Sequence, residues 1–401
     1  MQSPEMISEF SKLVSGFIYP NELEIQWSLL IVVYPYITGL VAGAFILASL
    51  VKIFNVKEVK PTYRISLLTA LAFLLVAPLP LQFHLGHPER SLEMFLTPNS
   101  RSAMAMFGFV YLWYLTVVLL LEIWFVYRKD MIVLSQIKKF PVNFLYKILS
   151  LFSTDISEKA LRFDEKAVKV ITIIGIPSAF ILHGYVGFMF GSVKANPWWS
   201  SVLMPIVFLF SAIVSGIALV ILIYMVIVSF RCGKIDMECL DKIAGYLFYA
   251  VIVDFSLEAL DFVHRLYESE ESIHILAEMV TTKLFISLVV IQIILGMILP
   301  LLIMVLIKIF RYNEELRKLL YFVSVVLIQI GIFSTRWNVV IGGQLFSKSF
   351  RGLTTYKMEF AGLEGLFSSV CILILPFVIL AVLAKILPPW NSVRPDMNIN
   401  P

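Results

Sequence analysis

The sequence has few charged residues and few cysteines. Only 15% of its 401 residues are charged, 59% are hydrophobic, and the mean hydropathy is +0.89. A water-soluble domain with this balance would have a largely apolar surface, so a soluble globular protein is excluded. The three cysteines, Cys232, Cys239 and Cys371, cannot supply the four thiolates of an iron–sulfur cluster. We therefore expect no iron–sulfur cluster in this chain.

Motifs for several other kinds of chemistry are also missing. The five histidines show no facing pair at interior depth on two helices, which argues against a bis-histidine haem. No group of residues has the spacing of a metal site, so we expect no metal. The sequence contains no nucleophile–base motif and no phosphate-binding loop. A net charge of +4 needs no nucleic acid to explain it.

Long apolar runs dominate what is present. A transmembrane helix needs about 20 largely apolar residues. The segments that meet this requirement are roughly 26–53, 64–84, 102–127, 168–191, 202–230, 243–265, 280–307, 318–340 and 364–387. They are too long and too uninterrupted for the strands of a membrane barrel. The sequence therefore predicts an all-α integral membrane protein with about nine transmembrane helices.

The N-terminus does not resemble a cleavable signal peptide. It lacks a basic start, a short apolar core and a small-residue cleavage site. Residues 5–19 are mildly amphipathic. We expect them either to lie along the membrane surface or to form an ordered tail.

The distribution of basic residues predicts the orientation in the membrane. When the connections are assigned to alternate sides, most of the 32 lysines and arginines fall on the side of the C-terminus. The positive-inside rule places that side in the cytoplasm, and the N-terminus outside. The longest connection, 128–167, is expected to be a cytoplasmic surface segment near anionic lipid.

The stretches expected on the outer side are aromatic, rich in proline and glycine, and of mixed charge. They are 19–27, 84–102, 191–201, 265–279 and 342–364. Tryptophans in and near them suit an interfacial aromatic belt. These are Trp27, Trp198, Trp199 and Trp337. The variety of polar residues is typical of a docking face, although ordinary loops share such a composition.

A weak internal repeat divides the helices into two groups. The stretches "TGLVAGAFIL" and "SAIVSGIALV" both place small residues four apart, a spacing that lets helices approach closely. The fourth and eighth helices both end in polar clusters, "HGYVGFMFG" and "TRWNVVIGG". We expect two four-helix bundles, helices 1–4 and 5–8, and an added ninth helix. The expected boundaries are 1–25 for an outer N-terminal segment, 26–191 and 202–340 for the bundles, 364–387 for the ninth helix and 388–401 for a cytoplasmic tail.

Intramembrane charges gather on the sixth helix. Asp254, Glu258, Asp261 and Arg265 follow one another at spacings of four, three and four residues, which places them on one helical stripe. The stripe is either a proton route between the membrane centre and the outer side or a buried ion-pair network. Arg336, near the outer end of the eighth helix, is the expected electrostatic partner of these carboxylates, Asp261 in particular.

Further polar residues share the outer depth on different helices. They are Tyr34, His84, His183, Tyr185, His264 and Glu364. Glu122 is the comparable acid near the inner end of the third helix. It is either an inner proton port or a partner of Arg128.

An outer polar pocket framed by aromatic side chains suits a quinone. The ring and tail of a quinone are apolar, whereas its carbonyl oxygens need hydrogen-bond donors and its reduction takes up protons. Tyrosine, histidine, asparagine and arginine can all serve. The competing class is a secondary transporter or an ion-conducting membrane protein, since internal repeats and midplane acids fit that class too.

Three stretches carry a resemblance to a known family. "HLGHPERSLEMFLTPNSRSAMAMFG", "HGYVGFMFG" and "RWNVVIGGQ" resemble the NrfD/PsrC family of polysulfide-reductase-type membrane subunits, and most of all its longer branch of hydrogenase and sulfite-reduction-associated subunits. The resemblance covers nearly the whole chain. It implies a quinone-reactive subunit of a respiratory oxidoreductase in the prokaryotic cytoplasmic membrane, which is not catalytic alone.

The same resemblance implies a cofactor and partners. The cofactor would be menaquinone or ubiquinone. The partners would be an extracytoplasmic ferredoxin-like iron–sulfur subunit and a catalytic subunit, which is a molybdopterin enzyme, a hydrogenase or a cytochrome. Electrons would pass between the quinone pool and the iron–sulfur subunit, and whether protons are translocated is left open.

The residue-by-residue match to the family is partial. Tyr185 matches the tyrosine of a helix 4 Tyr-Thr-Gly pattern that contacts quinone in the family. The family's asparagine and histidine near the start of helix 1 fall on Ile31 and Tyr34, and its loop aspartate and arginine fall on His84 and His87. These departures predict a differently tuned pocket.

Together these observations predict three groups of functional residues. The expected quinone site consists of Tyr34, His84, His183 and Tyr185. The expected proton-transfer groups are Asp254, Glu258, Asp261 and Glu122. Electrostatic or structural roles are expected for Arg336, Asn338 and Arg265.

Overall fold

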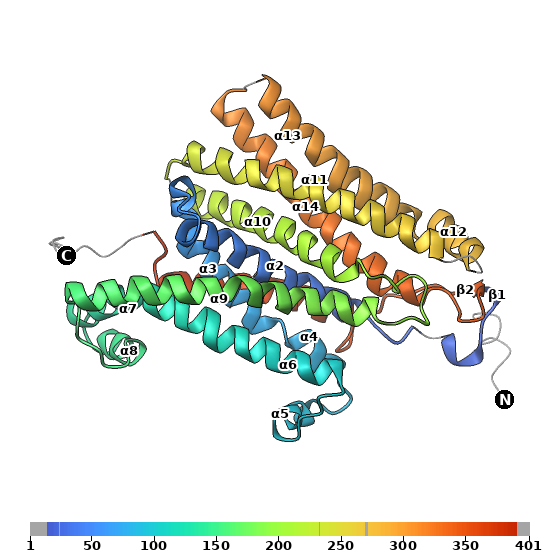
Figure 1. Cartoon of the computed structure of the whole chain (residues 1–401), viewed down its shortest axis with the longest axis horizontal. Helices are drawn as coiled ribbons and strands as arrows, with labels where there is room; N and C mark the ends of the chain where they lie inside the picture. The colour runs from blue at the N-terminus through green and yellow to red at the C-terminus, as the bar shows by residue number, and fades with distance from the viewer. Residues whose placement is uncertain (1–13, 24, 232, 269–271, 311, 391–401) are drawn as a thin grey trace.

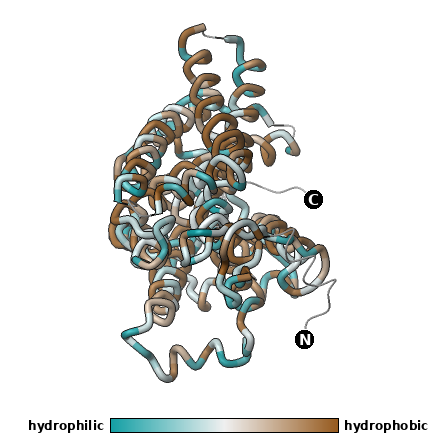
Figure 2. The backbone as a smooth tube through the Cα atoms, turned by 90° about the vertical axis from the view of Figure 1, so that its right-hand side faces the viewer, coloured by the Kyte–Doolittle hydropathy of each residue, from teal (hydrophilic) through white to brown (hydrophobic). Residues whose placement is uncertain are grey.

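The structure, a computed structural model, describes residues 14–23, 25–231, 233–268, 272–310 and 312–390. Within these residues, nine helical spans are long and apolar enough to cross a membrane. They are Leu29–Lys52, Lys57–His84, Ala103–Ile137, Glu158–Gly191, Met204–Phe230, Met237–Glu268, Phe285–Phe310, Glu314–Gln344 and Leu366–Ile386. Figure 2 shows hydrophobic residues along most of the helical tube. The prediction of an all-α integral membrane protein is confirmed.

Several spans consist of more than one helical segment. The first four spans contain α2 (Leu29–Lys52), η2 (Lys57–Val59), α3 (Lys60–Val76), α4 (Leu79–His84), α6 (Ala103–Trp113), the π-helical η4 (Tyr114–Leu120), α7 (Leu121–Ile137) and α9 (Glu158–Gly191). The later spans contain α10 (Met204–Phe230), α11 (Met237–Glu268), the π-helical η5 (Phe285–Ile298), α13 (Leu299–Phe310), α14 (Glu314–Val340), η6 (Gly342–Gln344) and α15 (Leu366–Ile386). The short elements outside the spans are β1 (Ser15–Phe17), η1 (Pro20–Glu22), η3 (Pro88–Arg90), α5 (Glu93–Leu96), α8 (Val142–Leu149), α12 (Ile273–Thr282) and β2 (Arg351–Leu353).

The two ends of the helical body differ in character (Figure 1). At one end β1 pairs antiparallel with β2, with Gly16 opposite Gly352, so the N-terminal segment lies on the connection before α15. We call this the sheet end. The opposite end, where α2 meets α3, carries Lys52, Lys57 and Lys60, and we call it the lysine end.

The connection predicted at 128–167 is shorter than expected. The helix α7 continues to Ile137 and α9 begins at Glu158, with α8 packed against α7 between them. The charged residues that suggested a loop are paired instead, since Arg128 Nη2 lies 2.7 Å from Asp164 Oδ2. A paired charge can extend a helix beyond its apolar core. The prediction therefore made both helices too short on the side of this connection.

Two helices near the middle of the body approach closely. α2 and α10 form the most extensive helix contact, and each packs also on α9 and α14. A Cβ atom on Gly216 of α10 would lie 2.4 Å from Gly43 Cα of α2. Backbones can approach this closely only where both residues are glycine. The small-residue spacing noticed in the sequence lies at this crossing.

The grouping into two four-helix bundles stays a prediction. It is compatible with the packing, because α2 contacts α3 and α9 while α10 contacts α11 and α14. α15 packs against α3. Residues 5–13 of the expected amphipathic segment and 391–401 of the expected tail lie outside the described residues.

A pair of glycine variants tests the α2–α10 crossing. We expect Gly216→Ala to destabilise the protein by about 1–3 kcal/mol, the usual cost of overpacking, because its new methyl group meets the α2 backbone. Gly245→Ala is the matched control, since nothing lies within 4 Å of its Cβ position. Thermal unfolding in detergent should show a lower midpoint for Gly216→Ala alone. Equal midpoints for both variants would contradict the packing.

Candidate functional site

Arg336 of α14 lies fully buried where α9, α10 and α14 meet. Its Nη2 donates to Ser211 Oγ of α10 at 2.5 Å and lies 3.3 Å from His183 Nε2 of α9. Its guanidinium carbon is 4.2 Å from the centroid of the Phe208 ring. Because a guanidinium only donates, His183 Nε2 must accept, which makes the imidazole neutral with its proton on Nδ1. The arginine thus fixes the tautomer of this histidine.

The carboxylates that act on Arg336 come from α11. Asp254 and Glu258 are the acidic residues whose charges would act on it when they are ionised. In the described part of the chain, both Asp254 oxygens and the Nε and Nη1 atoms of Arg336 are buried without a hydrogen-bond partner. The compensation of the buried charge is therefore electrostatic and acts without direct contact.

The expected partnership between Arg336 and Asp261 is not observed. Asp261 instead accepts hydrogen bonds from Arg265 Nη2 and Ser201 Oγ. Arg265 also donates through Nη1 to the Trp198 carbonyl at 2.5 Å. The one-turn spacing on α11 lets Arg265 reach Asp261 within its own helix, so Arg336 is left to Asp254 and Glu258.

A chain of side-chain amides joins Glu258 to α14. Gln292 Nε2 of η5 donates to Glu258 Oε2 at 2.8 Å, and Asn338 Nδ2 donates to Gln292 Oε1 at 2.6 Å. Thr335 Oγ1 lies 3.5 Å from Glu258 Oε1. Glu258 is half-buried because it lines a cavity of about 420 Å³ between the spans. Asn338 is therefore linked through Gln292 to the acidic stripe on α11, and not to Arg336, which lies two residues before it in the sequence.

The tryptophans after α9 are structural and not part of an interfacial belt. Trp198 and Trp199 are 4% and 7% exposed. Their Nε1 atoms donate to the carbonyls of Asn338 and Val339 at 2.8 and 2.6 Å. A Cβ on Gly343 would lie 2.0 Å from Trp199 Nε1, so only glycine leaves room for this contact. The two indoles hold the end of α14 that carries Arg336 and Asn338.

An aromatic cluster lies in the first four spans toward the sheet end. The Phe107 ring centroid is 5.9 Å from that of Tyr34, edge-on, and 5.7 Å from that of Tyr185. Tyr185 Oη donates to the Ala103 carbonyl at 3.0 Å. Tyr34 is 4% exposed, and its hydroxyl is buried without a partner in the described residues. The Tyr34 hydroxyl is therefore available to donate to a ligand.

The four residues expected to form one quinone site lie in three settings. Tyr34 and Tyr185 share the aromatic cluster. His183 packs on Gly39 of α2, whose Cβ would lie 3.1 Å from its Cε1, and bonds to Arg336. His84 pairs with Glu364, with Nδ1 and Oε1 3.0 Å apart. Likewise His264 pairs within its helix with Glu268 at 3.3 Å.

Glu122 lies toward the lysine end, and its surroundings exclude the interpretation that it pairs with Arg128. Its Oε1 accepts from Tyr63 Oη at 3.2 Å and from Thr172 Oγ1 at 3.0 Å. Its Oε2 is buried without a partner among the described residues. Arg128 is not its partner, since that guanidinium is bound to Asp164 and to the Asp155 carbonyl.

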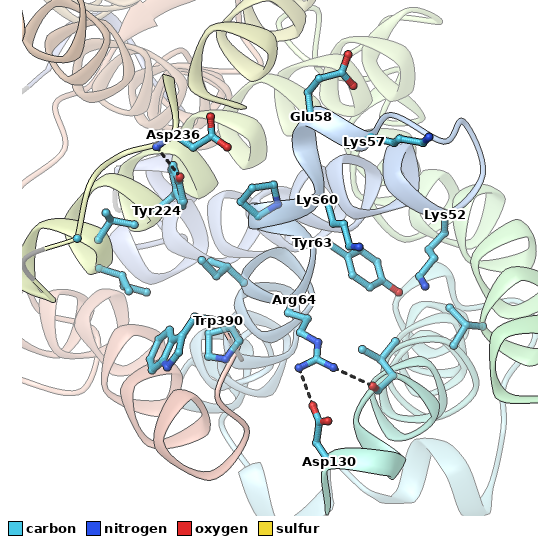
Figure 3. Close-up of a pocket in the computed structure, with 18 of the residues that line it drawn as sticks. Lys52, Lys57, Glu58, Lys60, Tyr63, Arg64, Asp130, Tyr224, Asp236 and Trp390 are labelled. Atoms are coloured by element: carbon cyan, nitrogen blue, oxygen red, sulfur yellow. Dashed lines mark hydrogen bonds and ion pairs between the residues drawn. The ribbon is translucent and has the colours of Figure 1, made fainter. Parts of the chain in front are cut away.

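A cavity of about 1050 Å³ lies at the lysine end, and Tyr63, which donates to Glu122, is among its lining residues. Figure 3 shows Lys52 and Tyr63 on its wall, with Arg64 paired to Asp130 and Trp390 on the far side. Because Tyr63 lines this cavity and also donates to Glu122, a single phenol separates the polar cavity from the buried carboxylate.

Three contributors were not identified from the sequence as site residues. Ser211 and Phe107 lie within stretches noted for other reasons, and Gln292 was not singled out. The lone glutamine in the apolar run "ISLVVIQIILGMILP" was a usable signal, because an isolated amide in a membrane span needs a partner. Within the described residues, no group of three or more histidines, cysteines, aspartates or glutamates is placed to hold a metal ion.

Comparisons with known proteins agree on one family. The family described as polysulphide reductase, NrfD, matches residues 20–348. A subunit of the selenate reductase of Mesobacillus selenatarsenatis is 34% identical over 248 residues, which cover 60% of this chain and 57% of that protein. A putative dimethyl sulfoxide reductase membrane subunit of Halobacterium salinarum is 26% identical over 58% of this chain and 51% of its own length.

A third relative is protein NrfD of Escherichia coli. It is 26% identical over 49% of this chain and 58% of its own length. The three matches therefore span less than two thirds of the relatives they match.

A double-variant experiment tests the contact-free compensation of Arg336. We expect Arg336→Met to lower stability by several kcal/mol, because it leaves Asp254 and Glu258 buried without their cation. Adding Asp254→Asn should recover part of the loss, since it removes one of the stranded charges. Arg351→Met, at an exposed position of β2, is the control. If the losses of thermal stability caused by Arg336→Met and by Asp254→Asn simply add in the double variant, the two residues are not coupled and the compensation is contradicted.

Proposed function

This chain belongs to the NrfD family, and from that premise we propose that it is a quinone-reactive membrane subunit of a prokaryotic respiratory oxidoreductase. It would exchange electrons between the quinone pool and an extracytoplasmic iron–sulfur subunit. That subunit would in turn be bound to a catalytic subunit. Support comes from the reductase subunits among the relatives and from the aromatic cluster near the sheet end.

The observation that carries the proposal is the Tyr34 hydroxyl. It is a buried donor with no partner in the described residues. The Tyr34 ring packs edge-on against Phe107, which in turn packs against Tyr185. A quinone head combines an apolar ring with carbonyl acceptors, so aromatic rings beside a phenol donor suit its chemistry. When bound, a quinone or quinol carries electrons and protons to and from the membrane pool. Tyr34 would hold its oxygen and Tyr185 would bound the ring on the more exposed side.

The two histidines have separate parts in this proposal. His84, paired with Glu364 at the end of α4, would pass protons near the sheet end. His183 would be a positioning residue, because Arg336 holds it neutral and it packs against α2, the helix that carries Tyr34.

The proposed orientation places the sheet end outside the cytoplasm, with the N-terminus outside and the C-terminus inside. The basic residues of the lysine end support it. The connection after α4 would then face the iron–sulfur partner. Leu92 and Leu96 in that connection are 66% and 80% exposed, which is apolar surface suited to a protein partner.

Proton transfer is proposed on two routes. Glu122 would take protons from the lysine-end cavity through Tyr63. Asp254, Glu258 and Asp261 would serve the other group of helices, with Arg336 as the electrostatic partner of Asp254 and Glu258. Arg265 would be the ion-pair partner of Asp261 in this stripe.

Removing the Tyr34 hydroxyl tests the quinone site. We expect Tyr34→Phe to fold normally, since it breaks no protein hydrogen bond, and to lower quinol-dependent turnover of the purified complex by about tenfold, as the loss of one hydrogen bond to substrate implies. Tyr114→Phe is the matched control, because Tyr114 is also buried with an unpartnered hydroxyl. Unchanged turnover in both variants, or equal losses in both, would remove Tyr34 from the site.

A glutamine variant tests the lysine-end route. We expect Glu122→Gln to reduce proton uptake per electron in proteoliposomes while uncoupled electron transfer persists, because the amide keeps the shape but cannot carry the proton. Glu165→Gln, exposed at the same cavity, should leave the ratio unchanged. The route is wrong if the ratio of protons to electrons is the same in Glu122→Gln and in the unmodified protein.

A further inference from the structure

The cavity that contains Glu258 lies between α10, α11, η5 and α14, away from the Tyr34 cluster. Its volume is about 420 Å³, within the range of small-molecule sites. Most of its wall is apolar, with Phe255, Phe262 and Ile293 among the lining residues. The polar groups are few and converge on one side.

The cavity opens toward the bilayer. Its lining includes Ala259 and Val263 of α11, which are exposed, Val263 by 62%. Across the opening, Val289 of η5 also lines it and is half-buried. In a membrane span, exposed apolar residues face lipid, so a ligand would enter sideways from the hydrocarbon region. Such a ligand must itself be lipid-soluble.

The polar side of the cavity offers hydrogen-bond acceptors. Asn338 Nδ2 and Gln292 Nε2 both donate along the amide chain toward Glu258. Asn338 Oδ1 is left buried with no partner in the described part of the chain. Glu258 Oε1 has only the long contact of 3.5 Å with Thr335. Two oxygens on residues that line the cavity therefore have hydrogen-bonding capacity that the described residues do not fill.

The charges around the cavity decide which donor fits. Glu258 and Asp261 both line it, and Arg265 is already bound to Asp261 and to the Trp198 carbonyl. The phosphate of a phospholipid would meet two carboxylates and no uncommitted cation among the described lining residues, which is unfavourable. A neutral hydroxyl donor meets no such cost.

We propose that this cavity is a second site for a lipid-soluble hydroquinone, with its hydroxyl groups directed at Asn338 Oδ1 and Glu258 and its tail in the bilayer. The choice of hydroquinone among lipid-soluble phenols rests on the proposed function. The site prefers the reduced form, because these two oxygens accept hydrogen bonds and a quinone carbonyl has none to donate.

Photolabelling of the purified complex in nanodiscs tests the site. The probe is a short-tailed hydroquinone with a diazirine on its tail, and the labelled peptides are identified by mass spectrometry. We expect labels on 255–263 and 288–293 in addition to labels near Tyr34. Ala259→Trp should fill the opening and lower the first labels by about tenfold, a loss of ~1.4 kcal/mol in binding. The Tyr34 labels should be unaffected.

Leu260→Trp is the matched control, because Leu260 is the next residue, is 59% exposed and does not line the cavity. It should leave both sets of labels unchanged. Labels confined to the Tyr34 region would overturn the second site and leave the proposed function intact. Equal labelling of 255–263 by the oxidised probe, or stronger labelling there by a diazirine phospholipid, would also overturn it. Absence of labels from both regions would overturn the second site and the proposed function together.

Discussion

The structure depends on one buried cation, the guanidinium of Arg336. A charge inside a membrane span is costly unless protein groups stabilise it, and here the stabilising groups come from three other helices. Ser211 and the neutral His183 accept its hydrogen bonds, while Asp254 and Glu258 supply the opposite charge from a distance. The helices α9, α10, α11 and α14 must therefore keep their relative positions. Trp198 and Trp199 hold the end of α14 in that arrangement.

Around this cation the polar groups fall into separate systems. The Tyr34 cluster lies among the first four spans, and the amide chain from Glu258 to Asn338 lies among the next four. Glu122 and its cavity occupy the lysine end. His183 belongs to the first set of helices and Arg336 to the second, so their contact joins the two sets at one buried point.

Much of the fold followed from the sequence, because long apolar runs identify membrane spans directly. The end of α7 and the start of α9 were predicted wrongly. The charges of Arg128 and Asp164 suggested a loop, whereas in the structure they are buried as an ion pair within the two helices. The spacing of the charged residues predicted the acidic stripe on α11, but the sequence did not predict the partner of each carboxylate. Whether Asp261 bonds to Arg265 or to Arg336 depends on how α11 and α14 are rotated. The sequence likewise grouped Tyr34, His84, His183 and Tyr185 by depth alone, and depth does not tell which side of a helix faces which neighbour.

We propose that this chain passes electrons between membrane quinol and an iron–sulfur partner. The most direct measurement follows the clusters of the partner by electron paramagnetic resonance after quinol is added to the purified assembly in nanodiscs. We expect the clusters to equilibrate with the quinol pool in the intact assembly and not in an assembly that lacks this chain. Cluster reduction at the same rate and to the same extent in both assemblies would contradict it.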